Sequence, residues 1–300
     1  VEQVTVNHRV TGSSPVAVAL VCGPFTPVVT GPLSLTERRT ETNRSPHMSS
    51  SSRPLADAGA YIILGAAGGI GSRIAEALAA DGATLVLAGR TLEKLTPLAT
   101  SLGAEAHQVE ASDFAAVESL VAEAKARHGR VAGIVNAVGS ILLKPAHLTS
   151  EAELAETLRL NVQTAFASVR AAGRVMTDGG SVLLFSSAAS ETGLPNHEAI
   201  AAAKGAVSGL VRSAAATYAP RKLRVNALAP GLVETPLAAR ITGNPASLAA
   251  SVVMHPAGRI GRAEDLVAPA RWLLDPASDW VTGQVIPVDG GMSRIKAPAR

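Results

Sequence analysis

The chain has 300 residues, of which 47% are hydrophobic and 17% charged, and this composition favours one or two folded domains over a disordered chain. Its 27 basic and 24 acidic residues are scattered, which argues against a nucleic-acid-binding surface, and its two Trp, two Tyr and four Phe are too few for a base-stacking platform. A single cysteine, Cys22, excludes an internal disulfide, a cysteine cluster for zinc and a CxxC redox pair, and no metal is expected.

The first 57 residues differ in composition from the rest. Residues 31–57 are rich in Ser, Thr, Arg and Pro and show no helical or strand period, so we expect residues 1–57 to be a disordered extension. Met48 lies in this tract, and translation from it would leave 253 residues (300 − 47); a genuine tail or targeting segment is the alternative. The apolar run 16–21 is shorter than the roughly 18 residues that span a membrane and lacks the basic start of a secretory signal. A cytoplasmic protein without a membrane partner is therefore expected.

From residue 58 onward, short apolar runs alternate with helix-forming stretches. Strands are expected at 61–64, 84–88, 104–109, 131–135, 181–185, 223–228 and 284–288, and helices at 70–80, 92–102, 114–127, 153–176 and 198–218. Strands that are apolar on both faces and separated by helices predict a parallel sheet covered on both sides. With right-handed crossovers, residues 58–300 should form one α/β domain, a Rossmann-type doubly wound parallel sheet of about seven strands.

A glycine-rich turn lies between the first expected strand and the first expected helix. Gly65, Gly69 and Gly71 have the spacing GxxxGxG, with Ile70 inside it. Glycines let the backbone turn tightly and approach a pyrophosphate, which then binds the unpaired N–H groups of the helix N-terminus. Because strand, turn and helix occur in the required order, the sequence predicts a dinucleotide-binding site.

Three further motifs accompany this turn. They are Asn136-Ala137-Val138-Gly139 after the fourth strand, Pro230-Gly231 with Thr235 after the sixth, and Val288-Asp289-Gly290-Gly291 near the end. Together with the glycine spacing, they resemble the classical short-chain dehydrogenase/reductase family over residues 60–292, although the first motif departs from the family's NNAG at two positions. The resemblance implies an NAD(P)(H)-dependent oxidoreductase acting on a small molecule, with cofactor contacts from Gly65, Gly69, Ile70, Gly71, Asn136, Gly139, Lys204, Pro230, Gly231 and Thr235.

Cofactor choice is determined at the end of the second strand, where an acidic residue would bind the adenine-ribose hydroxyls of NAD(H). This sequence has Gly89-Arg90 there, and a guanidinium can bind a 2′-phosphate through two hydrogen bonds. NADP(H) is therefore the preferred cofactor, while NAD(H) stays possible because Arg90 can also be a solvated residue at a helix start. Glu110 stands near the position where the family has an Asp that contacts adenine.

The family's catalytic centre contains an Asn, a Ser, a Tyr and a Lys. The resemblance assigns three of these roles to Asn161, which holds a water, Ser187, which polarises the substrate carbonyl, and Lys204, which binds the nicotinamide ribose. The tyrosine, four residues before the lysine, is replaced by Ile200, which lies thirteen residues after Ser187 as the family spacing requires. Ser187 also fits a simple turn at the end of a strand.

The absence of the tyrosine removes the usual proton donor. The chain's tyrosines, Tyr61 and Tyr218, lie elsewhere in the sequence, and isoleucine has no exchangeable proton. General acid–base catalysis worth roughly 10²–10⁴ in rate must therefore be replaced or lost. His197, one helical turn before Ile200, is one candidate donor, although it also fits a polar residue capping the helix start; Glu198 and a water ordered by Lys204 and Asn161 are the others.

Three functions remain open from the sequence. The first is a reductase or dehydrogenase with a non-tyrosine donor, acting on a ketone, aldehyde or quinone. The second is a non-redox enzyme that holds the nucleotide as a fixed group, and the third is a nucleotide-sensing protein without catalysis.

The substrate pocket should be walled by residues 188–196 and by the segment 237–255, a candidate lid. The apolar content of these segments indicates an uncharged or partly apolar substrate. Arg240 and Arg259 border the lid, and either could meet an acidic group, although both also fit solvated surface charges. The resemblance further implies a homodimer or homotetramer that pairs through the helices at 153–176 and 198–218.

Overall fold

The computed structural model describes residues 55–296, so most of the expected N-terminal extension, including Met48, lies outside the described residues. The last three residues of that extension are described, and Leu55–Asp57 forms a short 3-10 helix. Leu55 packs against the hydrophobic core, and the described structure therefore begins three residues before the boundary expected at residue 58.

A seven-stranded sheet forms the centre of the domain, in the order β3-β2-β1-β4-β5-β6-β9, and all of its strands pair in parallel. Its strands are β1 (Ala60–Leu64), β2 (Thr84–Gly89), β3 (Glu105–Gln108), β4 (Val131–Asn136), β5 (Gly180–Phe185), β6 (Leu223–Pro230) and β9 (Val285–Val288). The chain adds strands in one direction from β1 to β3 and in the other from β4 onward, so the carboxyl ends of β1 and β4 open a crevice between them. The predicted Rossmann-type fold is confirmed.

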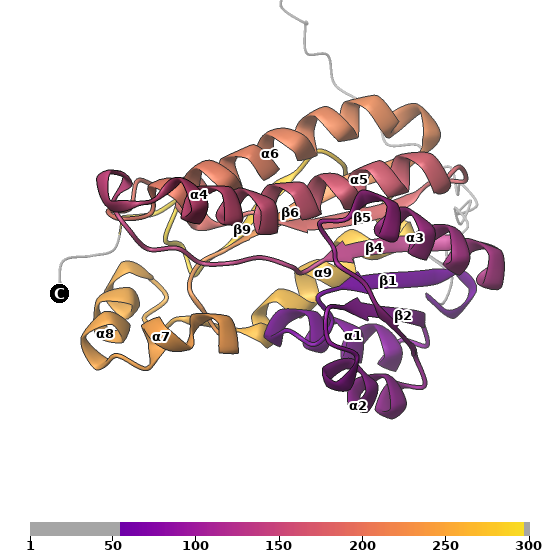
Figure 1. Ribbon diagram of the computed structural model, residues 1–300, viewed down its shortest axis with the longest axis horizontal. Coiled ribbons are helices and arrows are strands. Elements are labelled where there is room, and N and C mark those ends of the chain that lie inside the picture. The colour runs from indigo at the N-terminus through magenta and orange to yellow at the C-terminus, as the bar shows by residue number, and fades with distance from the viewer. Residues whose placement is uncertain (1–54, 297–300) are drawn as a thin grey trace, which may run out of the picture. The chain divides into compact units, whose positions relative to one another are not determined.

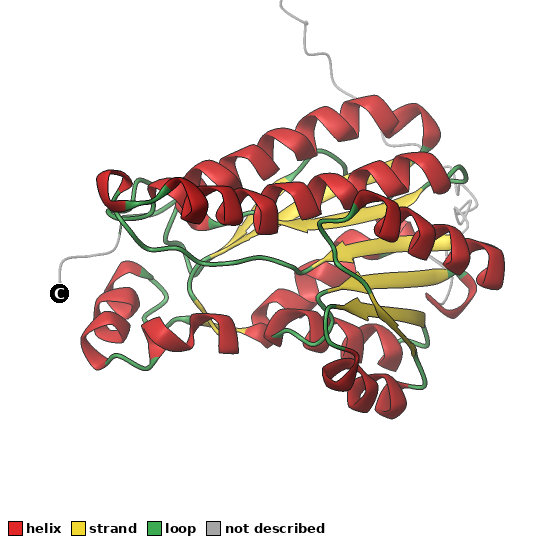
Figure 2. Cartoon of the chain, in the orientation of Figure 1, coloured by secondary structure: helices red, strands yellow, loops and turns green. Residues whose placement is uncertain are grey.

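Helices cover both faces of this sheet (Figures 1 and 2). On one face lie α3 (Phe114–His128), α4 (Glu151–Leu158), α5 (Thr164–Val175) and α6 (Glu198–Tyr218), and on the other α1 (Gly69–Ala80), α2 (Leu92–Leu102) and α9 (Val267–Leu274). Apolar side chains of the central strands therefore point alternately into two apolar cores. Ile62 and Leu64 of β1 belong to the first core, whereas Tyr61 and Ile63 belong to the second.

The long helix expected over 153–176 is interrupted. Between α4 and α5 the residues Arg159–Gln163 form a π turn, which places Asn161 inward with 2% of its surface exposed. A π turn adds one residue to a helix whose apolar pattern continues on either side, so the sequence pattern does not show it; such turns often occur at functional sites. The prediction of one continuous α-helix over 153–176 is therefore wrong.

The candidate lid is helical and stands apart from the two helical layers (Figure 1). It comprises α7 (Ala239–Thr242) and α8 (Pro245–Met254), and a two-stranded sheet of β7 (Val233–Glu234) and β8 (Gly261–Arg262) joins the two ends of the segment. Asn244 begins α8 by accepting a hydrogen bond from the N–H of Ser247. The lid thus connects to the carboxyl end of β6, next to the crevice.

None of the helices within residues 55–296 combines the length and the apolar character that crossing a membrane requires.

Candidate functional site

The glycine-rich turn follows β1 and requires glycine at two of its positions. Gly65 has φ +76°, a backbone conformation that side chains disfavour, and its carbonyl accepts the N–H of Gly68 at 2.9 Å. A Cβ on Gly71 would lie 2.4 Å from the carbonyl oxygen of Gly65, so α1 can approach the turn only without a side chain there. The N-cap of α1 is Gly68, which has no side chain to bond the first N–H groups. These groups remain available for an anion.

A cavity of about 250 Å³ lies over this turn, at the crevice where the strand order reverses. Six of the residues expected to contact a cofactor line it, namely Gly65, Gly69, Ile70, Arg90, Gly139 and Thr235. Gly71 does not line it but packs against Gly65, and Asn136 is buried with its Oδ1 accepting the N–H of Val138 at 3.0 Å. Asn136 therefore fixes the loop after β4 rather than facing the cavity.

Arg90 and Glu110 lie at the adenine end that the sequence predicts for this cavity. Arg90 is exposed, and its carbonyl accepts the Nε2 of Gln108 at 3.0 Å. Glu110 accepts hydrogen bonds from the N–H and Oγ of Ser112 at 3.1 and 2.8 Å. Partial burial opposes ionisation, but these bonds and the charges of Arg159 and Arg90 lower the pKa of the Glu110 carboxyl. Glu110 is therefore ionised and held in place.

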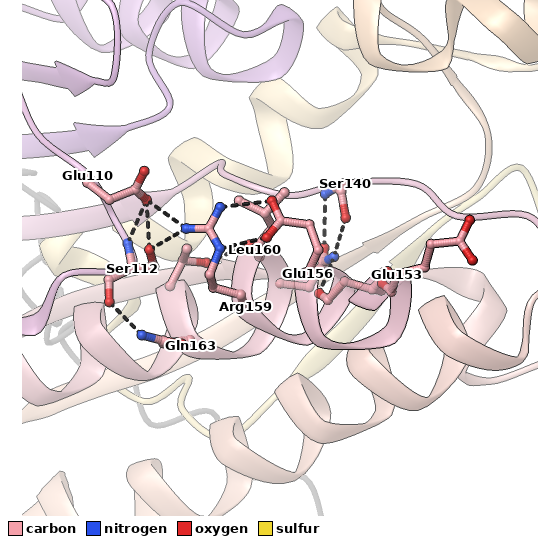
Figure 3. Close-up of polar contacts among 11 residues, drawn as sticks. Glu110, Ser112, Ser140, Glu153, Glu156, Arg159, Leu160 and Gln163 are labelled. Atoms are coloured by element: carbon pink, nitrogen blue, oxygen red, sulfur yellow. Dashed lines mark hydrogen bonds and ion pairs between the residues drawn. The ribbon is translucent and has the colours of Figure 1, made fainter. Parts of the chain in front are cut away.

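Arg159, which sequence reasoning missed, connects this region to the π turn (Figure 3). Its Nη1 donates to Ser112 Oγ at 2.7 Å, and its Nε and Nη2 donate to the two carboxylate oxygens of Glu156 at 2.7 and 2.8 Å. Gln163 adds a hydrogen bond to the carbonyl of Ser112 at 2.8 Å. An arginine among glutamates on a helix predicts only an exposed ion pair, so no sequence signal identifies this contact with the loop after β3.

Asn161 sits on the π turn and is fully engaged by its neighbours. Its Nδ2 donates to Ser140 Oγ and to the carbonyl of Thr157, each at 2.9 Å, and its Oδ1 accepts the N–H of Ser140 at 3.3 Å. A Cβ on Gly139 would lie 3.0 Å from Asn161 Oδ1 and 3.5 Å from Lys204 Nζ. The structure therefore brings Asn161 and Lys204 together beneath Gly139, at the edge of the nucleotide cavity.

Lys204 is buried on α6, with 8% of its surface exposed. Its Nζ donates to the carbonyl of Phe185 at 2.9 Å, and no carboxylate contacts it among the described residues. Burial lowers the pKa of the Lys204 ammonium to about 8. Its carbonyl accepts Ser186 Oγ at 3.1 Å, so the serine next to the candidate Ser187 ties the end of β5 to α6.

Ser187, Ile200 and His197 line a second cavity of about 800 Å³. Ser187 Oγ accepts the N–H of Ala189 at 3.2 Å. Ile200, one turn before Lys204, is buried with 5% exposed. His197 is half-buried, and its Nδ1 lies 2.8 Å from the carbonyl oxygen of Pro195, so Nδ1 carries a hydrogen.

Other predicted residues lie around the second cavity. Pro230 and Gly231, expected to contact the cofactor, line this larger cavity, whereas Thr235 lines the smaller one. Leu237 lines both cavities, so the two adjoin there. Glu198 is exposed and does not line either cavity.

His255, at the end of α8, was also missed. It is 2% exposed; its Nε2 accepts the N–H of Leu232 at 3.1 Å, and its Nδ1 lies 2.6 Å from the carbonyl of Ser251. The imidazole therefore attaches the lid to the segment after β6. A lone histidine in an alanine-rich stretch gives no sequence signal of this role.

The residues around the smaller cavity suit a dinucleotide. It combines a helix N-terminus without a side-chain cap, a glycine turn in which a Cβ would collide with backbone, and an exposed arginine at the end of β2. Gly65, Gly69, Ile70, Arg90 and Thr235 would hold such a group, and Lys204 lies next to Gly139, which also lines this cavity.

Comparison with known proteins gives consistent results. A family model described as Enoyl-(Acyl carrier protein) reductase matches residues 65–293. Galactitol 2-dehydrogenase (L-tagatose-forming) of Cereibacter sphaeroides is 35% identical over 78% of this chain and 95% of its own length. A short-chain type dehydrogenase/reductase from Mycobacterium ulcerans has a TM-score of 0.76 at 30% identity, covering 80% of this chain and 92% of its own. A candidate NAD(P)-dependent gluconate 5-dehydrogenase from Beutenbergia cavernae, with NADP bound at low occupancy, has a TM-score of 0.74 at 35% identity, covering 80% of this chain and 98% of its own.

Proposed function

The chain belongs to the short-chain dehydrogenase/reductase family, and from this premise we propose that it is an NADP(H)-dependent oxidoreductase that reduces a ketone, aldehyde or quinone with a proton donor other than tyrosine. One observation carries the proposal. Ser187, His197 and Ile200 line one cavity, and that cavity adjoins the nucleotide cavity at Leu237. Polar groups able to polarise and to protonate a carbonyl are thus present where the tyrosine is missing.

Ser187 and His197 have different roles at the carbonyl oxygen: Ser187 donates a hydrogen bond, and His197 donates the proton. Because Ser187 Oγ accepts the Ala189 N–H, its own hydrogen is left to donate to the substrate oxygen. His197 as imidazolium keeps its Nδ1 hydrogen on Pro195 and gives its Nε2 hydrogen to the same oxygen, which leaves a neutral imidazole. The reduced nicotinamide, when bound, supplies the hydride for the carbonyl carbon. Lys204 would bind the nicotinamide ribose beside Gly139, and Asn161 next to it would hold a water.

Arg90 supports the choice of NADP(H). It is exposed at the end of β2 and lines the nucleotide cavity, where it can bind a 2′-phosphate. The relative from Beutenbergia cavernae binds NADP.

Single-turnover oxidation of NADPH by the full chain, over a panel of ketones, aldehydes and quinones, tests the proposal. We expect the native protein to turn over at least one compound and His197→Gln to slow that step by roughly 10²–10⁴-fold. Glu198→Gln is the matched control, because Glu198 is adjacent, exposed and outside the cavity. It should change the rate by less than about threefold.

Each alternative result has a definite meaning. If His197→Gln retains the native rate, the donor is not His197, and the water near Lys204 and Asn161 becomes the candidate. If only Ile200→Tyr turns over, the proposed native reduction is wrong, although the cofactor site is competent.

A nucleotide-binding protein without carbonyl reduction is the second candidate. Ile200 favours it, because this buried apolar side chain faces the cavity one turn before Lys204. A non-redox enzyme that keeps the nucleotide as a fixed group stays open on the same ground. Both predict nucleotide binding without NADPH oxidation by the native protein.

The chain is further proposed to form a homodimer or homotetramer through α4, α5 and α6. Exposed apolar side chains on the first two of these helices support this pairing, namely Leu154, Leu158 and Phe166. Phe166 stacks on Phe114 with ring centroids 5.8 Å apart, which holds it in place at the surface.

A further inference from the structure

Five titratable side chains line the larger cavity, and most of them are already engaged. They are Lys144, Glu153, His197, Arg240 and His255. The Lys144 ammonium contacts both carboxylate oxygens of Glu153, at 2.8 and 3.0 Å. This contact, with hydrogen bonds from Ser150, lowers the pKa of Glu153 to about 2, so the pair is fully charged near neutral pH and its charges cancel. Both ring nitrogens of His255 are bound to backbone groups.

Arg240 differs from these groups. It lies on α7, it is exposed at the cavity, and within residues 55–296 no ion pair or hydrogen bond engages its guanidinium. Arg259, the other arginine that borders the lid, forms two bonds to the carboxylate of Asp265, at 2.6 and 2.8 Å, and does not line the cavity. The structure thus separates two arginines that the sequence could not distinguish. Because the charges of Lys144 and Glu153 cancel, Arg240 gives the cavity an excess of positive charge.

The remaining lining is apolar and partly exposed. It includes Ile141, Leu143, Leu237 and Met254, with 38, 41, 55 and 42% of their surfaces exposed. Large apolar side chains left exposed around one cavity indicate a ligand that covers them.

We propose that the substrate is a carboxylic acid with an apolar body, whose carboxylate binds Arg240 while its carbonyl group reaches Ser187; the second half of this statement rests on the proposed function. A planar carboxylate can accept two parallel hydrogen bonds from a guanidinium that has no other partner. The apolar body covers the exposed leucine, isoleucine and methionine side chains between the two polar ends.

Binding without turnover tests the Arg240 contact. Octanoate and 1-octanol have the same chain and differ in charge, and each is titrated by calorimetry into the full chain saturated with NADP⁺. We expect octanoate to bind the native protein more tightly than 1-octanol, and Arg240→Gln to weaken octanoate by about tenfold while leaving 1-octanol unchanged. Arg259→Gln is the matched control and should leave both affinities unchanged.

Three results would overturn the inference: no binding of octanoate to the native protein, equal affinities for the two probes, or an unchanged octanoate affinity in Arg240→Gln. A second experiment separates this inference from the proposed reduction. NADPH oxidation with 7-oxooctanoate is compared with its methyl ester, and the native protein should prefer the acid by about tenfold, a preference that Arg240→Gln removes. Selective octanoate binding without oxidation of either ketone would retain the carboxylate site and reject the reduction.

Discussion

The two cavities of this domain are built from different parts of the chain. The smaller one is bounded by strand ends and by a turn in which backbone atoms pack on backbone atoms, so that a Cβ on Gly71 would lie 2.4 Å from the Gly65 oxygen. The larger one is bounded by side chains from separate segments, including α7 and α8 of the lid. Backbone packing tolerates very few residue types, whereas a side-chain wall tolerates many.

This difference explains what each cavity can reveal about function. The nucleotide cavity constrains the sequence at fixed glycine positions, and these constraints are shared by every chain that binds the same group in the same way. The larger cavity specifies its ligand through single side chains such as Arg240, whose partners depend on the folded structure. A sequence motif can therefore predict the class of cofactor, whereas predicting the class of substrate requires the folded structure.

The largest expected effect is on the backbone-built cavity. Gly71→Ala places its Cβ against the Gly65 oxygen and 3.1 Å from the Ala66 Cα, and neither backbone atom can move without opening the turn. NADP⁺ affinity, measured by calorimetry, should fall on the order of 100-fold. Gly209→Ala is the matched control, because a Cβ there meets nothing within 4 Å. It should stabilise α6 by about 0.5–1 kcal/mol and leave NADP⁺ binding intact. Equal affinities in the two variants would contradict the distinction between the cavities.

Much of the fold could be predicted because its signals are local. The apolar runs placed the seven strands of the sheet, and the helices over 92–102 and 198–218 have the bounds of α2 and α6. Failures arose where the backbone departs from a regular period. The π turn at Arg159–Gln163 does not alter the apolar pattern, and β7 and β8 are too short to show a period of two.

The candidate site divides in the same way. The glycine turn follows the end of a strand, and the resemblance to the family assigns Ser187 and Lys204, so all three could be proposed from the sequence. The Arg159 contact with Ser112 joins residues 47 apart in the sequence, and the attachment of His255 to Leu232 joins residues 23 apart. Such contacts depend on how the elements pack, and no local pattern encodes them.

Lys204 is buried beside Gly139 of the nucleotide cavity, and its burial should be measurable as a pH dependence of stability. Its pKa is about 8 in the folded chain against 10.5 for a lysine in water, so the unfolded chain binds more protons between these pH values and stability rises with pH. The full change is on the order of 3 kcal/mol. Urea unfolding of the nucleotide-free chain from pH 8 to 10 should show this rise in the native protein and not in Lys204→Met.

The measurements stop at pH 10 because a second buried group, the Tyr61 phenol, changes the pH dependence above that value. Burial raises the pKa of the Tyr61 phenol to about 12, so the folded chain binds the extra proton above pH 10 and stability falls there. Lys94→Met, which changes an exposed lysine on α2, should follow the native protein at every pH. If the free energy of unfolding changes with pH in the same way for the native protein and Lys204→Met from pH 8 to 10, Lys204 is solvated.

The smallest expected effect concerns an exposed side chain of the nucleotide cavity. Arg90 is exposed at the end of β2, so its contact with a 2′-phosphate is partly screened by water. Arg90→Gln should lower the affinity for NADP⁺ about tenfold and change the affinity for NAD⁺ by less than about twofold, both measured by calorimetry. Arg73→Gln, on α1 and outside the cavity, is the matched control. An equal loss for both nucleotides would mean that Arg90 maintains the cavity rather than choosing the cofactor.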